Sequence, residues 1–141
     1  VNIMSIFLTI ISGVAVFLLG QTVLKLFVEP WQVQRECIAK IAHHLLLYAN
    51  VYANPGVGTD EANREASTET RKLASELIAS CRRIPFYDAL SKWGVFPRME
   101  SILEAQKNLI GLSNSTHSGD PLHNASRSDK IKELLDIKFG E

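Results

Sequence analysis

The side chains in this sequence that are best suited to catalysis or metal binding are its four histidines. Two are adjacent, His43 and His44, and two lie in a polar stretch nearer the C-terminus. Neighbouring residues on a helix point about 100° apart, so His43 and His44 are poorly placed to share one metal ion. The metal-binding spacings H-x-x-x-H and H-E-x-x-H do not occur. Glu36 and Lys40 precede His44 at steps of four, which favours a surface charge network.

The other candidate nucleophiles show no catalytic pattern. Cys37 and Cys81 are the only cysteines, and they form no C-x-x-C pair. Each falls on an apolar position of an expected helix, so both thiols are expected to be buried. Two buried free thiols fit a reducing compartment. No serine lies in G-x-S-x-G, and no phosphate-binding glycine loop occurs. We therefore expect a protein that is not an enzyme, with no catalytic, cofactor-binding or metal-ligating residue, no cofactor and no small-molecule substrate.

The charged residues are distributed unevenly along the chain. The 141 residues carry 15 basic and 15 acidic side chains, and zero net charge argues against a nucleic-acid partner. Residues 1–24 contain no charged residue and no histidine. As a helix this stretch is about 36 Å long, against roughly 30 Å of bilayer hydrocarbon. A cleaved signal peptide is the alternative, but no basic residue precedes the apolar run. We expect a transmembrane helix over residues 1–28 and the lipid bilayer as a partner.

Small residues repeat along one side of the expected span. They follow one another at steps of about three, four and seven, which keeps them on one helix face. Small faces let membrane helices approach closely. The face expected to mediate helix–helix association in the membrane consists of Ser5, Thr9, Ser12, Gly13 and Gly20.

Lysine and arginine near the span predict its orientation. None precedes it, whereas Lys25, Arg35 and Lys40 follow it. The N-terminus is therefore expected outside and the C-terminal domain in the cytoplasm. Lys25 and Trp31 are expected at the membrane interface, where tryptophan is enriched. Packing of Trp31 in a soluble core is the alternative.

Residues 29–141 are expected to form a small helical domain. Through 31–53, apolar side chains repeat at steps of three and four and form a stripe for packing or for a partner. The stripe consists of Ile38, Ile41, Leu45, Tyr48 and Tyr52. Asn54-Pro55-Gly56 ends this helix, and Thr59 is expected to cap a second one that runs to about Arg83.

An aromatic segment follows the break at Ile84-Pro85. Phe86, Leu90 and Trp93 share one side of a short expected helix, which Gly94 ends, and Phe96 follows. We expect these four side chains to pack in the core of the domain. An amphipathic element that lies on the membrane is the alternative.

Two further helices complete the expected all-α fold, a bundle of about four helices after the membrane helix. One runs from Pro97 to about Leu112, and the polar residues 113–127 are expected to form a mobile loop. Ser126 or Ser128 then caps a last helix.

Several strings together carry a resemblance. They are L-F-V-E-P (26–30), Y-A-N-V-Y-A-N-P-G (48–56), R-K-L-A-S-E-L (71–77), I-P-F-Y (84–87) and N-L-I-G-L-S-N-S (108–115). With them the chain resembles a family of uncharacterised small bacterial single-span membrane proteins with a helical cytoplasmic domain. The resemblance covers most of the chain. It implies the bacterial inner membrane, and no functional residue carries over from it.

The expected function is that of a membrane-anchored scaffold or accessory subunit, either a homo-oligomer or a subunit of a larger membrane complex. A pore-forming effector of holin-like or defence type is the alternative, since a small-faced span and an oligomerising domain would serve it equally. A membrane-anchored enzyme would need a polar cleft that the sequence does not indicate.

Overall fold

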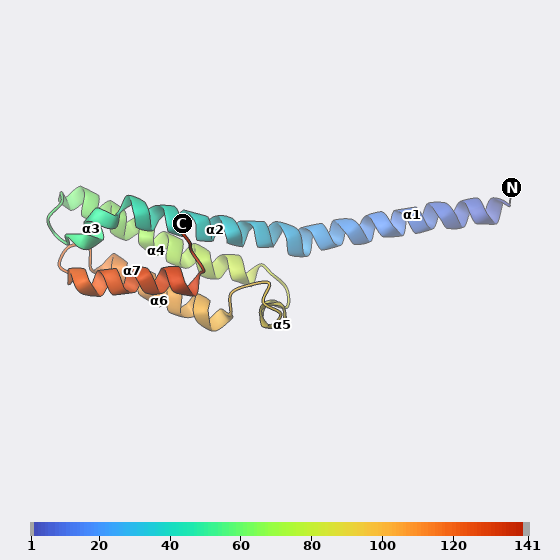
Figure 1. Ribbon diagram of the computed structural model, residues 1–141. Coiled ribbons are helices and arrows are strands. Elements are labelled where there is room, and N and C mark those ends of the chain that lie inside the picture. The colour runs from blue at the N-terminus through green and yellow to red at the C-terminus, as the bar shows by residue number, and fades with distance from the viewer. Residues whose placement is uncertain (1, 140–141) are drawn as a thin grey trace.

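One long helix dominates the architecture. The computed structural model describes residues 2–139, in which the regular structure is entirely helical, so the all-α prediction is confirmed. α1 (Ile3–Val23) passes through one π-helical turn, η1 (Leu24–Val28), into α2 (Glu29–Leu47). The result is a continuous helix of 45 residues (Figure 1). Residue 1 of the expected span and residues 140–141 of the expected domain lie outside the described part.

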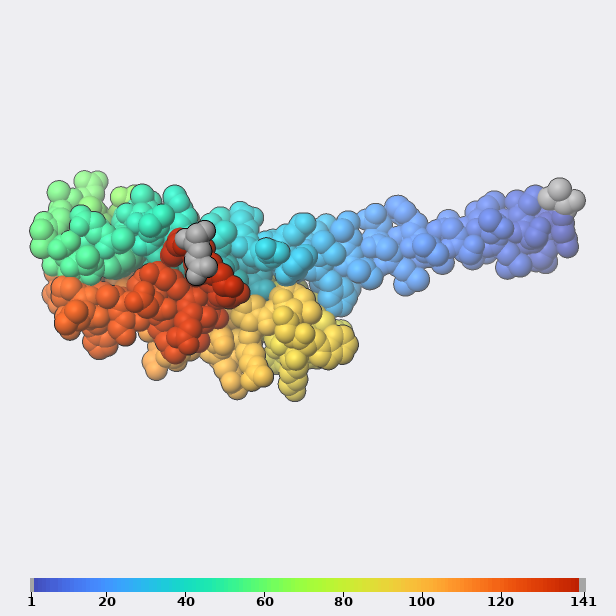
Figure 2. Space-filling view, in the orientation of Figure 1, coloured from blue at the N-terminus to red at the C-terminus, as the bar shows by residue number. Residues whose placement is uncertain are grey.

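The remaining helices fold back against α2. They are α3 (Ala49–Ala53), α4 (Asp60–Arg82), α5 (Tyr87–Lys92), α6 (Met99–Asn114) and α7 (Pro121–Leu134). α4 packs against both α2 and α6, α6 packs against α7, and α7 contacts α3. The long helices α2, α4, α6 and α7 thus form the expected bundle, while α1 projects from it alone (Figures 1 and 2).

The bundle core is formed by residues that repeat at steps of three and four. In α4 the buried side runs through Ala66, Leu73, Leu77 and Cys81, and the small Ala66 lets a neighbouring helix approach closely. Complete burial of a side chain such as Leu77 stabilises the fold by about 1.5–3 kcal/mol. The other fully buried apolar residues are Ile41, Ile102, Ala105, Leu109, Leu112 and Ile131.

The turn between α3 and α4 lies where the sequence predicted the end of the helix over residues 31–53. Thr59 is the N-cap of α4, and its Oγ1 accepts a 3.2 Å hydrogen bond from the amide of Ala62. Gly56 has φ +75°, and its amide donates to the carbonyl of Thr116 at 3.0 Å. A Cβ at this position would overlap the carbonyl of His117. Glycine is therefore required here both by φ and by the close approach of the next turn.

The prediction of a mobile loop over residues 113–127 is wrong. α6 extends to Asn114, and α7 begins at Pro121 with Asp120 as its N-cap, instead of Ser126 or Ser128. Four of the polar side chains that suggested a loop, Ser113, Ser115, Thr116 and Asn124, are buried. Ser115 Oγ donates to Asn124 Oδ1 at 2.5 Å, and Asn124 Nδ2 donates to the carbonyl of Tyr52 at 3.1 Å. These bonds hold the α6–α7 turn against α3.

Candidate functional site

The exposed helix α1 is the most unusual surface of the molecule. None of its residues is buried, although most are apolar. Contiguous apolar surface of this extent marks a site that meets lipid or another protein. Within residues 2–139 it is the single helix that is long and apolar enough to cross a membrane, and such a helix can be either a span or a signal sequence.

The hydroxyl groups of α1 are bonded to its own backbone. Ser5 Oγ donates to the carbonyl of Asn2 at 2.7 Å, Thr9 Oγ1 to that of Ser5 at 2.8 Å, and Ser12 Oγ to that of Thr9 at 2.9 Å. Because each hydroxyl proton has a partner, these side chains carry a reduced desolvation penalty in hydrocarbon.

In the described part of the chain, the small face of α1 is not packed against the bundle. A Cβ placed on Gly13 or Gly20 would meet no other atom within 4 Å. The face that contains Ser5, Thr9, Ser12, Gly13 and Gly20 is therefore fully available to another helix. Its role in association remains a prediction.

The junction between α1 and α2 has a distinct geometry. The amide of Glu29 donates to the carbonyl of Leu24, five residues back, which defines the π turn. Pro30 lies in the first turn of α2, where its ring would crowd the carbonyl four residues before it. The wider π turn accommodates the proline without breaking the helix. Of the expected interface residues, Lys25 is exposed in this turn. Trp31 is half-buried, with the guanidinium carbon of Arg35 5.3 Å from its ring centre.

Three apolar side chains project from the loop region around α5. Phe86 is 77% exposed and Trp93 is 81% exposed, and Val95 is exposed beside them. Phe86 adopts a left-handed backbone with φ +57°, which costs about 1–2 kcal/mol for a residue other than glycine. The prediction that Phe86 and Trp93 pack in the core is therefore wrong. The left-handed turn at Phe86 sets the phase of α5, so that Tyr87 and Ser91 face inward instead.

Buried hydrogen bonds fix α5 in this orientation. Gln34 of α2 donates to the Tyr87 hydroxyl at 2.8 Å and lies 3.1 Å from the Cys81 sulfur. The Tyr87 hydroxyl donates in turn to the carbonyl of Pro97 at 2.8 Å. Burial raises the pKa of Tyr87, so the phenol stays protonated and able to donate. One cluster thus joins α2, α4, α5 and the start of α6.

The remaining residues of the aromatic segment and the α2 stripe pack as predicted. Phe96 is buried with its ring centre 5.5 Å from that of Tyr87, and Leu90 is partly buried. In the stripe, Ile41, Leu45 and Tyr52 are buried, while Ile38 and Tyr48 are partly buried against the core.

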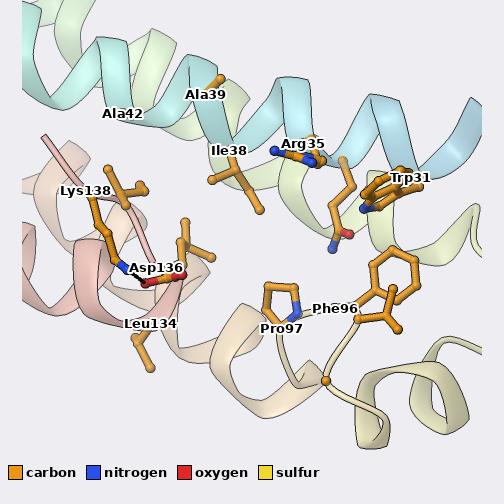
Figure 3. A pocket seen from close by; sticks show the side chains of 15 residues that line it. Trp31, Arg35, Ile38, Ala39, Ala42, Phe96, Pro97, Leu134, Asp136 and Lys138 are labelled. Carbon is orange, nitrogen blue, oxygen red and sulfur yellow. Dashed lines mark ion pairs between the residues drawn. The ribbon is translucent and has the colours of Figure 1, made fainter. Parts of the chain in front are cut away.

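A groove opens beside the junction, between α2, the turn over residues 94–97 and the segment after α7 (Figure 3). Its volume is about 720 Å³. Trp31 and Ile38 line it from α2, and Phe96 and Pro97 line it from the opposite side. Asp136 and Lys138 form an exposed ion pair of 3.7 Å at its border. The groove shows that Trp31 and the 94–97 turn lie at the same level of the bundle.

His44 lies in the core and not in a surface charge network, so that prediction is wrong. Glu36 and Lys40 do pair at 3.1 Å, but on the surface and without His44. The Nε2 atom of His44 lies 2.9 Å from the Tyr52 hydroxyl and 2.8 Å from Thr70 Oγ1. Burial lowers the His44 pKa to about 4 and raises that of Tyr52 to about 12. Both groups are therefore neutral near pH 7.

The buried hydrogen bonds that Gln34, Tyr87 and Thr70 make between helices were not predicted from the sequence. A signal for Gln34 exists, because it lies three and seven residues before Cys37 and Ile41 and therefore on the buried side of α2. Its polar type at an apolar position indicates a buried hydrogen-bond partner.

The thiols match their prediction. Cys37 and Cys81 are free and buried, and burial raises the pKa of Cys37 to about 11. Among residues 2–139, no three His, Cys, Asp or Glu side chains are grouped as metal ligands would be.

Comparison of the chain with protein-family models, curated proteins and solved structures found no match.

Proposed function

We propose that this chain is a single-span membrane protein whose helical domain acts as a non-enzymatic scaffold or accessory subunit in a bacterial inner-membrane complex. The observation that carries the proposal is the exposed apolar helix α1, which is continuous with α2 of the bundle. Among residues 2–139 this helix has no packing partner, so lipid or a second membrane helix would be its natural environment.

The polar groups inside the bundle support a structural role for the domain. His44, Tyr52 and Thr70 bond one another across α2, α3 and α4, and Gln34 and Tyr87 bond across α2 and α5. Networks of this type specify one arrangement of helices. A rigid domain on a membrane anchor, with an open groove beside α2, suits the presentation of a surface to partner subunits.

The proposed orientation places the N-terminus outside and the domain in the cytoplasm. Lys25, Arg35 and Lys40 follow α1 on its C-terminal side. Basic residues near a span are retained on the cytoplasmic side. In spheroplasts, an external protease should leave the domain intact, and degradation of the domain would reverse the orientation.

The small face of α1 is the proposed contact between copies or with a partner span. Gly13 and Gly20 are seven residues apart, which suits the left-handed crossing of membrane helices. Gly13→Leu and Gly20→Leu would place bulk on this face. Ala15→Leu introduces the same side chain about 160° from Gly13 around the helix, so it is the control.

The deciding experiment is the native mass of the complex after gentle extraction from the membrane, with all subunits identified. A homo-oligomer that Gly13→Leu and Gly20→Leu dissociate, but Ala15→Leu does not, supports self-assembly. A larger complex at fixed stoichiometry supports the accessory-subunit form. A chain that is released as a monomer without partners, or is recovered outside the membrane, would end the proposal. Conductance in planar bilayers by the isolated oligomer would instead favour the pore-forming alternative.

A further inference from the structure

The exposed aromatic surface around α5 lies at the end of the bundle from which α1 emerges. Figure 1 shows α5 beside the start of α2, far from the turns that join α3 to α4 and α6 to α7. The hydrogen bonds agree with this placement of α5. Tyr87 of α5 bonds to Gln34 of α2, and Gln34 lies three residues after Trp31. That separation is about 4.5 Å along the helix axis. Trp31 and Val95 also line the same groove.

The same region is basic in a chain of zero net charge. Residues 82–98 contain four basic side chains, Arg82, Arg83, Lys92 and Arg98, against the single acidic Asp88, and all five are exposed. The opposite end of the bundle has the reverse balance. There, residues 54–64 and 115–123 contain three acidic side chains and one basic one.

The backbone at Phe86 adds a third observation. A left-handed conformation is unfavourable for phenylalanine, yet here it directs the ring into solvent. The bonded Tyr87 next to it holds this geometry. The chain thus maintains an unfavourable backbone that exposes an aromatic ring beside Trp93 and a basic cluster.

We infer that this surface, consisting of Phe86, Trp93, Val95 and the basic side chains of residues 82–98, is a second membrane contact that lies on the anionic headgroups of the leaflet from which α2 emerges. Aromatic side chains at the headgroup level and arginine or lysine opposite anionic lipid are the usual basis of such contacts. The inference depends on the proposed span, because α1 brings the surface to the bilayer.

The test uses the full chain in nanodiscs that contain phosphatidylglycerol, with bromine on the acyl chains as a fluorescence quencher. The chain has two tryptophans, so Trp31→Phe leaves Trp93 as the only emitter. Bromolipid should quench Trp93, and the bilayer should protect it from aqueous acrylamide. If acrylamide still quenches the Trp93 emission and bromolipid does not, the inference is overturned.

Two reporters separate this result from the proposed function. In a Trp31→Phe, Trp93→Phe background, Leu122→Trp places the emitter at the opposite end on a side chain that is 80% exposed, close to the 81% of Trp93. It should stay unquenched by lipid. In the same background, Phe17→Trp reports on α1 itself. If lipid quenches the emitter at position 17 but not Trp93, only the second membrane contact is refuted. If lipid does not quench the emitter at position 17, the proposed span is refuted.

Three changes test the chemistry of the contact. Replacement of phosphatidylglycerol by phosphatidylcholine, or Arg82→Gln with Arg83→Gln and Lys92→Gln, should lower the quenched fraction of Trp93 emission. Phe86→Asn should also lower it, and because asparagine tolerates the left-handed backbone, the helical content should be retained. Unchanged quenching in all of these variants would show that the basic and aromatic side chains do not form the contact.

Discussion

Acidification should destabilise the bundle through His44, which is 5% exposed. In the folded chain, burial between α2, α3 and α4 lowers the pKa of this imidazole from 6.5 to about 4. Its Nε2 atom already contacts the hydroxyls of Tyr52 and Thr70. A proton added to the ring would leave a charge in the core, whereas the unfolded chain accepts the same proton in water.

The two pKa values of His44 set the size and direction of the effect. Between them the unfolded state binds a proton that the folded state does not, so stability rises with pH in this window. Stability is complete above the unfolded pKa and decreases as the pH falls toward the folded pKa. From about pH 7.5 to about pH 5 the expected loss is about 2 kcal/mol.

Urea unfolding of the full chain in detergent micelles, followed by circular dichroism, measures this loss. For a domain of this size, about 2 kcal/mol corresponds to a midpoint lower by roughly 1 M urea. Carboxylates also contribute to acid sensitivity, so the comparison is with His44→Gln, which lacks the titrating ring. His43→Gln, at the exposed neighbouring position, is the matched control and should behave as wild type. If His44→Gln lost as much stability between the two pH values as wild type, the assignment to His44 would be refuted.

Three further predictions concern the turns and the thiols. Asp120→Ala removes the N-cap of α7, so the urea midpoint should fall by the equivalent of about 1 kcal/mol; an unchanged midpoint would show that Pro121 alone starts the helix. Gly56→Ala places a Cβ against the carbonyl of His117 at a positive φ. Its cost should therefore exceed the roughly 1 kcal/mol typical of strain alone, and a stabilised variant would contradict the turn geometry. Cys37 should react with maleimide far more slowly in the folded chain than in urea, since burial raises its pKa to about 11; equal rates would show that the thiol is accessible.

The parts of the fold that follow from neighbours in sequence could be predicted. The uncharged run gives α1, and Thr59 with its following acidic residues gives the start of α4. Their determinants lie within one or two helical turns, which periodicity and capping describe. The buried side of α4 followed from the same spacing.

The errors occurred where a distant partner decides. Glu36 and Lys40 suggest a surface position for His44, but Thr70 lies 26 residues away and takes the ring into the core. The polar residues after α6 resemble a loop until Asn124 bonds to the carbonyl of Tyr52, 72 residues distant. In the candidate site, a hydrogen bond between Gln34 and Tyr87 sets which side of α5 is exposed. The spacing of residues along the chain does not reveal such distant contacts.

The continuous helix through η1 joins α1, the proposed span, and the bundle into one mechanical element. α2 extends 19 residues beyond the π turn, a length of about 28 Å at 1.5 Å per residue. A change of about 10° in the tilt of the span, small against the range that membrane helices adopt, would move the far end of α2 by about 5 Å. Bilayer thickness, or a neighbour that tilts the span, would thereby be converted into a displacement of the α3 end of the bundle. If α1 spans the bilayer as proposed, the chain would act as a rigid arm that pivots at the membrane surface.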